Sequence, residues 1–129
     1  MAENKYVADP KRMPAFMAVA GTGGDLCYLD TGSATNVVGA LTFAGVLDTT
    51  TAAGSYGVIE TEGVFTFVRG NGTANTTIEQ GQDIYGSNAT TVATAQVSSG
   101  SVIGLCWERV SVETASVSVY IKGMNSLLM

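Results

Sequence analysis

Glycine is the feature that most constrains how this chain can fold. The 129 residues include sixteen glycines, which after Pro14 recur every 8 to 15 residues over much of the chain. Short runs rich in Val, Thr, Phe and Tyr lie between them, such as YGVIE (56–60) and GVFTFV (63–68). This is the spacing of strands and turns, and no apolar stripe with a 3.6-residue period is long enough for a substantial helix. The chain is therefore predicted to be all-β.

Two runs show the alternation of strands and predict how they are covered. In residues 116–122, Val117, Val119 and Ile121 share one face, and Ser, Tyr and Lys side chains share the other. In residues 63–68, both phenylalanines point to one side, while both valines point to the other, so neither face is fully polar. Strands that are apolar on both faces belong in a sandwich, a closed barrel or an oligomer. We expect a small antiparallel β-barrel or sandwich.

Two local predictions accompany this fold. The best helix candidate is residues 48–55, DTTTAAGS, in which Asp48 could cap a single turn, although the Thr run and Gly54 weaken it. Trp107, the single tryptophan, would share a face with Ile103 and Leu105, so it is predicted to lie in the core rather than to act as an exposed anchor.

The stretch FVRGNGTANTT (67–77) raises the question of a phosphate-binding loop. Such a loop needs a strand before it and a helix after it, with a Lys or acidic partner at set spacing. The residues after Gly72 are a poor helix start, and Asn71-Gly72 is a strong signal for a tight turn. The same reasoning predicts turns at 21–24 (GTGG) and 31–35 (TGSAT).

The composition also argues against catalysis. The chain contains no histidine, the commonest general base. Carboxylate pairs are conceivable at Asp25 and Asp30, which bracket one strand, and at Glu60 and Glu62. We interpret these acids instead as residues at strand ends and on a solvated face. No calcium-loop motif is present, so neither an enzyme nor a cofactor or metal site is expected.

Cysteine content and charge limit the partners and the compartment. Cys27 and Cys106 each lie in an apolar run and are predicted to be buried and reduced, although one disulfide is an alternative. The net charge of −5 argues against nucleic acid as a partner. No run approaches the roughly 20 apolar residues of a membrane span, and no signal peptide is visible. We expect synthesis in a cytoplasm and no membrane partner.

Residues 1–14 differ from the rest and predict an extended N-terminal arm, followed by a single β domain over 15–129. The arm holds three of the six cations and both prolines, Pro10 and Pro14, which disfavour helix. Fully extended, it could reach roughly 45 Å at about 3.3 Å per residue. Its candidate contact residues are the apolar and basic side chains Tyr6, Val7, Lys11, Arg12 and Met13.

From about residue 40 onward, the order of features resembles the tailed-phage capsid decoration, or cement, proteins. The resemblance rests on GVIETEGVFTFV (57–68), IEQGQDIY (78–85), GSVIGLCWE (100–108) and VSVYIKG (117–123). It implies a non-enzymatic virion protein on the outside of an icosahedral capsid, commonly a trimer, that bridges subunits of the major capsid protein. We add the hypothesis that the arm contacts the capsid.

One alternative belongs to a different class of function. A small β-barrel binding module, such as a carbohydrate- or receptor-binding domain on a virion, would expose several aromatic residues over polar groups. Tyr28, Tyr56, Tyr85 and Tyr120 are the candidates for that role, and nothing in the sequence groups them.

Overall fold

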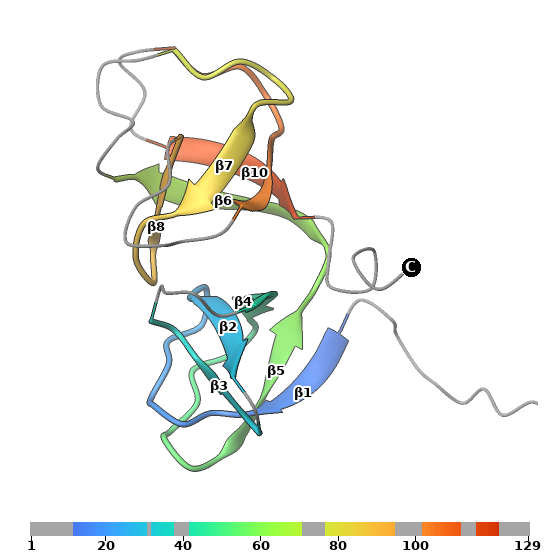
Figure 1. Cartoon of the computed structure of the whole chain (residues 1–129), viewed down its shortest axis with the longest axis vertical. Coiled ribbons are helices and arrows are strands. Elements are labelled where there is room, and N and C mark those ends of the chain that lie inside the picture. Colours follow the sequence, from blue (N-terminus) through green and yellow to red (C-terminus); the bar gives the residue numbers. More distant parts are fainter. Residues whose placement is uncertain are drawn as a thin grey trace, which may run out of the picture.

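The computed structural model contains two β units, one above the other in Figure 1, and describes residues 12–30, 32–37, 42–70, 77–94, 102–111 and 116–121. The first unit is a five-stranded sheet in the order β1-β5-β4-β2-β3, and the second is a closed barrel in the order β10-β6-β8-β7-β9. The sheet comprises β1 (Arg12–Phe16), β2 (Leu26–Asp30), β3 (Ser33–Thr35), β4 (Thr42–Leu47) and β5 (Tyr56–Glu60). The barrel comprises β6 (Gly63–Arg69), β7 (Asp83–Gly86), β8 (Thr91–Ala93), β9 (Val102–Cys106) and β10 (Ser116–Ile121).

The prediction of an all-β chain is confirmed, since the described residues form strands, bridges, turns and bends. The helix candidate at 48–55 is wrong. This segment bends between β4 and β5, and Thr51 forms an antiparallel bridge to Gly21 with backbone hydrogen bonds of 2.9 Å in both directions. The amide and carbonyl of Thr51, which a helical turn would pair within the segment, therefore form their hydrogen bonds with Gly21.

The five-stranded sheet curls until its two edge strands meet. Met17, just after β1, forms a parallel bridge to Ala34 in β3, and the Ala18 amide donates to the Ala34 carbonyl at 2.9 Å. The interior of this curled sheet is a cluster of small and medium side chains, namely Ala15, Met17, Cys27, Ala34, Ala44, Leu47 and Ile59. The curled sheet encloses little volume, so small and medium side chains fill its interior at native packing density.

The opposite face of the sheet packs on the barrel. Leu26, Tyr28, Phe43 and Val46 belong to one buried cluster with the barrel interior. The Leu26 amide also donates to the Ala89 carbonyl, at 2.8 Å, in the turn between β7 and β8. The two units therefore share a hydrophobic core, while the sheet keeps a second, smaller core of its own.

Strands β6 and β10 show the alternation expected from the sequence. Val117, Val119 and Ile121 are fully buried, and Phe67 is buried beside them. The two strands pair antiparallel from Ser116–Val68 to Ile121–Gly63. One barrel pairing departs from the antiparallel expectation, because β6 lies parallel to β8 through Val68–Thr91 and Arg69–Val92.

Strand β1 begins at Arg12, before the start of the β domain predicted at residue 15, and it includes Pro14. The Met17 amide donates to the Ser55 carbonyl at 2.9 Å. Two residues and four residues earlier in β1, the pairs Ala15–Gly57 and Met13–Ile59 are therefore also of the hydrogen-bonded type. Pro14, opposite Val58, occupies the intervening type of pair, in which the backbone nitrogen points away from β5. A proline is tolerated there because no ladder bond is lost.

The cysteine prediction is confirmed: Cys27 and Cys106 are both free and buried. Cys27 lies inside the sheet core, whereas Cys106 lies in the core of the barrel. Burial, with a smaller contribution from the charge of Asp25, raises the pKa of the Cys27 thiol to about 12. Within the described ranges, no helix is long and apolar enough to cross a membrane.

Candidate functional site

The acidic residues do not form a catalytic pair. Asp25 is buried, at 4% exposure, which corrects the expectation that it lies on a solvated face. Its Oδ2 accepts hydrogen bonds from the Thr22 amide and from the Asn36 Nδ2, both at 2.9 Å. Asp25 therefore closes the 22–25 turn and ties it to the segment after β3. Asp30, by contrast, is exposed at the far end of β2.

The two glutamates lie with different partners. Glu60 approaches the Arg12 guanidinium at 3.7 Å, while Glu62 accepts a hydrogen bond of 3.1 Å from the Tyr120 hydroxyl. This bond to the carboxylate is the main reason why the pKa of Tyr120 is raised. Across the described part of the chain, no group of three or more His, Cys, Asp or Glu side chains could hold a metal ion.

The glycine-rich stretch at 21–24 is a turn, as expected, whereas the predicted turn at 31–35 is only partly correct, because Ser33–Thr35 form strand β3. Gly24 and Gly32 adopt φ angles of 99° and 84°, the left-handed region that favours glycine, and Gly32 links β2 to β3. The central part of the stretch at 67–77, including Asn71-Gly72, lies outside the described residues. Strand β6 leads into it and ends at Arg69.

The tyrosines proposed for a binding module are dispersed. Tyr28 is fully buried in the shared core, where its ring packs edge-on against Phe43 at 5.5 Å between centroids. Tyr56 lies on the sheet and is 75% exposed, whereas Tyr85 and Tyr120 are half-buried on the barrel. No common platform unites them.

The outer face of β1 and β5 carries an apolar surface that we name the β1–β5 patch: Pro14, Phe16, Tyr56 and Val58. These four exposed residues form two directly opposed cross-strand pairs. The rings of Phe16 and Tyr56 meet edge-on at 5.3 Å. A shallow groove of about 270 Å³ adjoins the patch. It is lined by Pro14, Ala15, Phe16, Leu29, Asp30, Gly32, Ser33 and Tyr56.

The predicted arm contacts fall partly within the described structure. Arg12 and Met13 belong to β1, at the end of the β1–β5 patch. The Arg12 guanidinium lies 4.0 Å from Asp48 as well as 3.7 Å from Glu60, and Met13 packs against the sheet core. Both residues are thus engaged within their own chain. Tyr6, Val7 and Lys11 lie outside the described residues.

A second surface lies on the barrel, and it corrects the prediction for Trp107. This side chain is 48% exposed, because it follows the inward-facing Cys106 and lies beside the outward-facing Ser118, to whose carbonyl the Trp107 amide donates at 2.8 Å. Its ring lies 5.7 Å from that of Tyr120. With the outward side chains of β6 and β10 it forms what we name the uncharged face: Val64, Thr66, Val68, Ser118, Tyr120 and Trp107.

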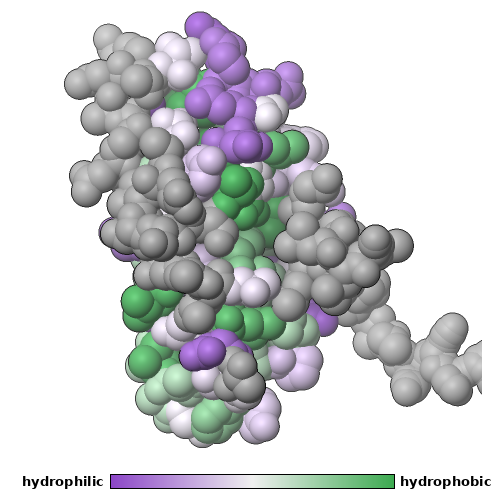
Figure 2. Space-filling model, in the orientation of Figure 1, coloured by the Kyte–Doolittle hydropathy of each residue, from purple (hydrophilic) through white to green (hydrophobic). Residues whose placement is uncertain are grey.

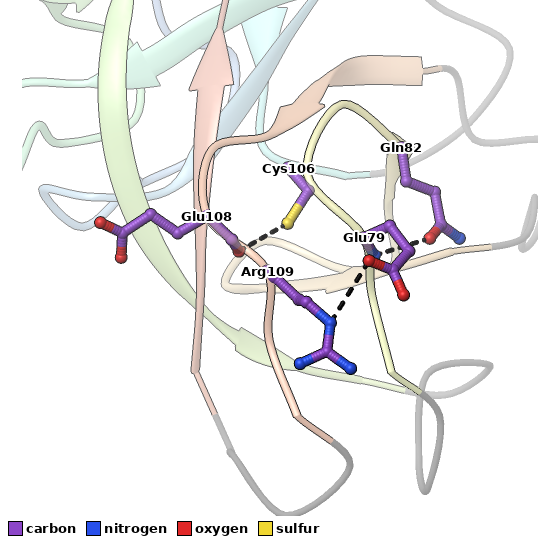
Figure 3. A network of polar contacts seen from close by, with 5 residues as sticks. All are labelled: Glu79, Gln82, Cys106, Glu108 and Arg109. Atoms are coloured by element: carbon purple, nitrogen blue, oxygen red, sulfur yellow. Dashed lines mark hydrogen bonds and ion pairs between the residues drawn. The ribbon is translucent and has the colours of Figure 1, made fainter.

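The end of the barrel next to this face is held by a polar network (Figure 3). Arg109 pairs with Glu79 at 3.3 Å, and the Gln82 side chain accepts from the Glu79 amide at 3.1 Å. The Cys106 thiol donates to the Glu108 carbonyl at 3.0 Å. Backbone bonds of 2.9 Å also link Cys106 with the 81–82 turn. The segments 78–82 and 106–110 are therefore fixed together.

Polarity is unevenly distributed between the two units. On the face shown in Figure 2, hydrophilic residues gather at the barrel end of the molecule, while apolar residues are frequent over the middle and the sheet end. This distribution agrees with an exposed apolar surface on the sheet unit.

The comparison with known families bears on the role of these surfaces. A family model described as phage cement protein matches residues 14–121, from within β1 to the end of β10. The chain belongs to the phage cement protein family. Among curated proteins, no match is found. Family membership assigns a structural role at the phage capsid, in agreement with the resemblance noted in the sequence. Two of the segments that carry this resemblance, 78–85 and 100–108, are linked by the backbone hydrogen bonds between the 81–82 turn and Cys106.

Proposed function

We propose that this cement protein sits on the outside of an icosahedral phage capsid and bridges neighbouring subunits of the major capsid protein, as an oligomer and most simply a trimer. The observation that carries the proposal is the β1–β5 patch, which lies within the region matched by the family model. Its function is to bind, without catalysis, and to hold capsid subunits together.

The composition of the β1–β5 patch suits a protein partner. Tyr56 is three-quarters exposed and is supported from the side by Phe16, so its ring is already oriented before binding. Aromatic residues of this kind often dominate the binding energy of protein interfaces. The Arg12, Asp48 and Glu60 charges at one end of the patch form a polar rim.

The N-terminal arm extends the same contact. Residues 1–11 lead directly into β1, so Tyr6, Val7 and Lys11 are connected to the β1–β5 patch by a short length of chain. We assign them to the capsid contact, with Arg12 and Met13 supporting the strand from which the arm departs. Weak contacts of single copies add up through effective concentration when the copies are joined in an oligomer.

The test is a binding isotherm on purified capsids that lack the protein. Tyr56→Ser is expected to weaken binding by about 2 kcal/mol, or roughly thirtyfold, as for a central aromatic anchor. Deletion of residues 1–11 is expected to weaken it further, because the anchors Tyr6 and Val7 are removed together with Lys11.

Val37→Ser serves as the matched control, because Val37 is an apolar side chain that is 60% exposed and lies outside the β1–β5 patch. Its affinity should equal that of the wild-type protein. Equal affinity of all three variants would refute the assignment of the patch and the arm, and absence of any capsid binding by the wild-type protein would refute the proposed function.

A further inference from the structure

The uncharged face of the barrel is an interaction surface that the capsid contact does not use. It lies on β6, β10 and the bend after β9, whereas the β1–β5 patch lies on the other unit. Val64 and Val68 are 43% and 53% exposed, and Trp107 is 48% exposed. Val64 lies opposite Tyr120 on the adjacent strand β10, and the Tyr120 ring lies beside Trp107, so these side chains form one surface rather than scattered single residues.

Charge indicates which partner fits this surface. The chain carries a net charge of −5, so two copies repel each other wherever their acidic surfaces meet. All six residues that define the uncharged face are neutral, and the carboxylate of Glu62 adjoins it through the hydrogen bond from Tyr120. A neutral centre with charges at the rim is the usual anatomy of a protein–protein interface.

The polar groups at the centre of the face are self-complementary. Thr66 and Ser118 lie directly opposite each other on β6 and β10, with their hydroxyl oxygens 3.3 Å apart. A hydroxyl both donates and accepts, so the same two groups on another copy can satisfy these hydroxyls without any unpaired charge. A basic partner would bind an acidic surface rather than this uncharged one.

The aromatic pair at one side supplies a preformed anchor. Tyr120 is held by its hydrogen bond to Glu62 and by the Trp107 ring, so neither ring must be ordered again on binding. The barrel-end network fixes the bend that carries Trp107, through the bond of 3.1 Å from the Gln80 Nε2 to the Trp107 carbonyl. Preorganised aromatic side chains lower the entropic cost of association.

We infer that the uncharged face is the surface through which copies of this chain associate with one another. This inference deepens the proposed function, because it assigns self-association to the barrel and leaves the β1–β5 patch free for the capsid. A closed barrel offers no strand edge, so association through this unit takes place by packing of its face.

The experiment measures the mass of the free protein by sedimentation from micromolar to millimolar concentration, together with the fluorescence of Trp107, the single tryptophan. The mass is expected to rise with concentration while the Trp107 emission moves to shorter wavelength. Val68→Glu and Thr66→Glu should weaken association on the order of a hundredfold, because an unpaired charge is forced into the contact. Both side chains are exposed, so both variants are expected to fold.

Val58→Glu is the matched control, since Val58 is an exposed valine at 36% on the β1–β5 patch. It should leave the association unchanged and impair capsid binding. A monomer at every concentration would overturn the inference. So would an oligomer that both face variants leave intact. Normal self-association without capsid binding would instead refute the proposed function alone.

Discussion

The two β units bury their interiors in different ways. The barrel is closed, and large aliphatic side chains such as Ile84, Val119 and Ile121 fill it. The sheet only curls, and its own interior contains three alanines and a cysteine among its seven members. The sheet gains the rest of its burial by packing Leu26, Tyr28 and Phe43 on the barrel. The smaller unit is therefore stabilised by its neighbour as much as by its own core.

Truncation of Tyr28 should weaken the packing of the sheet on the barrel most severely. The side chain is fully buried, and it lies against Gly86 of β7, where an added Cβ would overlap the Tyr28 hydroxyl. Tyr28→Ala should lower the free energy of unfolding by about 3–5 kcal/mol, as for other large aromatic truncations. Urea unfolding measured by Trp107 fluorescence and by circular dichroism would show whether both units lose stability together.

Tyr28→Phe is the control for that experiment. Because no described residue accepts a hydrogen bond from the Tyr28 hydroxyl, its removal should leave stability nearly unchanged. A large loss in this variant would show that the hydroxyl, rather than the packing of the ring at the junction, stabilises the contact between the units.

A matched pair of truncations compares the two cores directly. Ile59 in the sheet core and Ile121 in the barrel core are both fully buried. Ile→Ala at either position should cost about 2–5 kcal/mol. We expect a single cooperative transition in both variants, because the shared cluster couples the units. Two separate transitions in Ile59→Ala, measured by calorimetry, would show that the sheet unfolds by itself.

Alkaline pH should destabilise the protein through both cores. Burial raises the pKa of Cys27 to about 12 and that of Tyr28 to about 12, above their ordinary values of 9.0 and 10.0. The folded state therefore retains these protons where the unfolded state releases them. Stability should be full below pH 9 and fall as the pH rises from there toward 12, by up to about 1.4 kcal/mol per pH unit for each such proton.

Equilibrium unfolding at a series of pH values would measure this loss. Cys27→Ala should reduce the slope above pH 9 and leave the stability at neutral pH lowered only by the lost packing. Native thiol titration gives an independent check, because neither Cys27 nor Cys106 should react before unfolding. A thiol that reacts readily in the folded protein would contradict the burial of that cysteine.

The smallest effect is expected at the surface ion pair of the barrel. Arg109 and Glu79 are both about two-thirds exposed, at 64% and 66%. Arg109→Ala should change the free energy of unfolding by less than about 1 kcal/mol. Thermal unfolding at low and high salt would detect it. A larger loss would mean that the barrel-end network is needed to position the bend after β9.

Much of this architecture follows from local sequence patterns. Glycine spacing predicted strands and turns, and the alternation at Val117, Val119 and Ile121 predicted the inward face of β10. The division into two cores depends on pairings between distant strands, such as β1 with β5, which no local pattern specifies. The helix candidate at 48–55 was wrong because a bridge to Gly21 outweighs the weak local preference.

The candidate surfaces were only partly predictable, for related reasons. Alternation placed Val64 and Val68 on the face of β6 opposite the phenylalanines, and both valines are exposed there. It placed Trp107 in the core because it assumed unbroken alternation from Ile103, whereas the register between β7 and β9 shifts within the strand, so that Cys106 faces inward and the next side chain outward. The β1–β5 patch was missed because Phe16 and Tyr56 are far apart in the sequence and become neighbours only through strand pairing.

Pro14 has a consequence for pairing between copies of the chain. An edge strand with all its amides available can pair with the same edge of another copy and so start an aggregate. Pro14 offers no amide at the middle of the β1 edge, so the row of donors is interrupted there. A single imino acid thus disfavours extension of the sheet from one copy into the next.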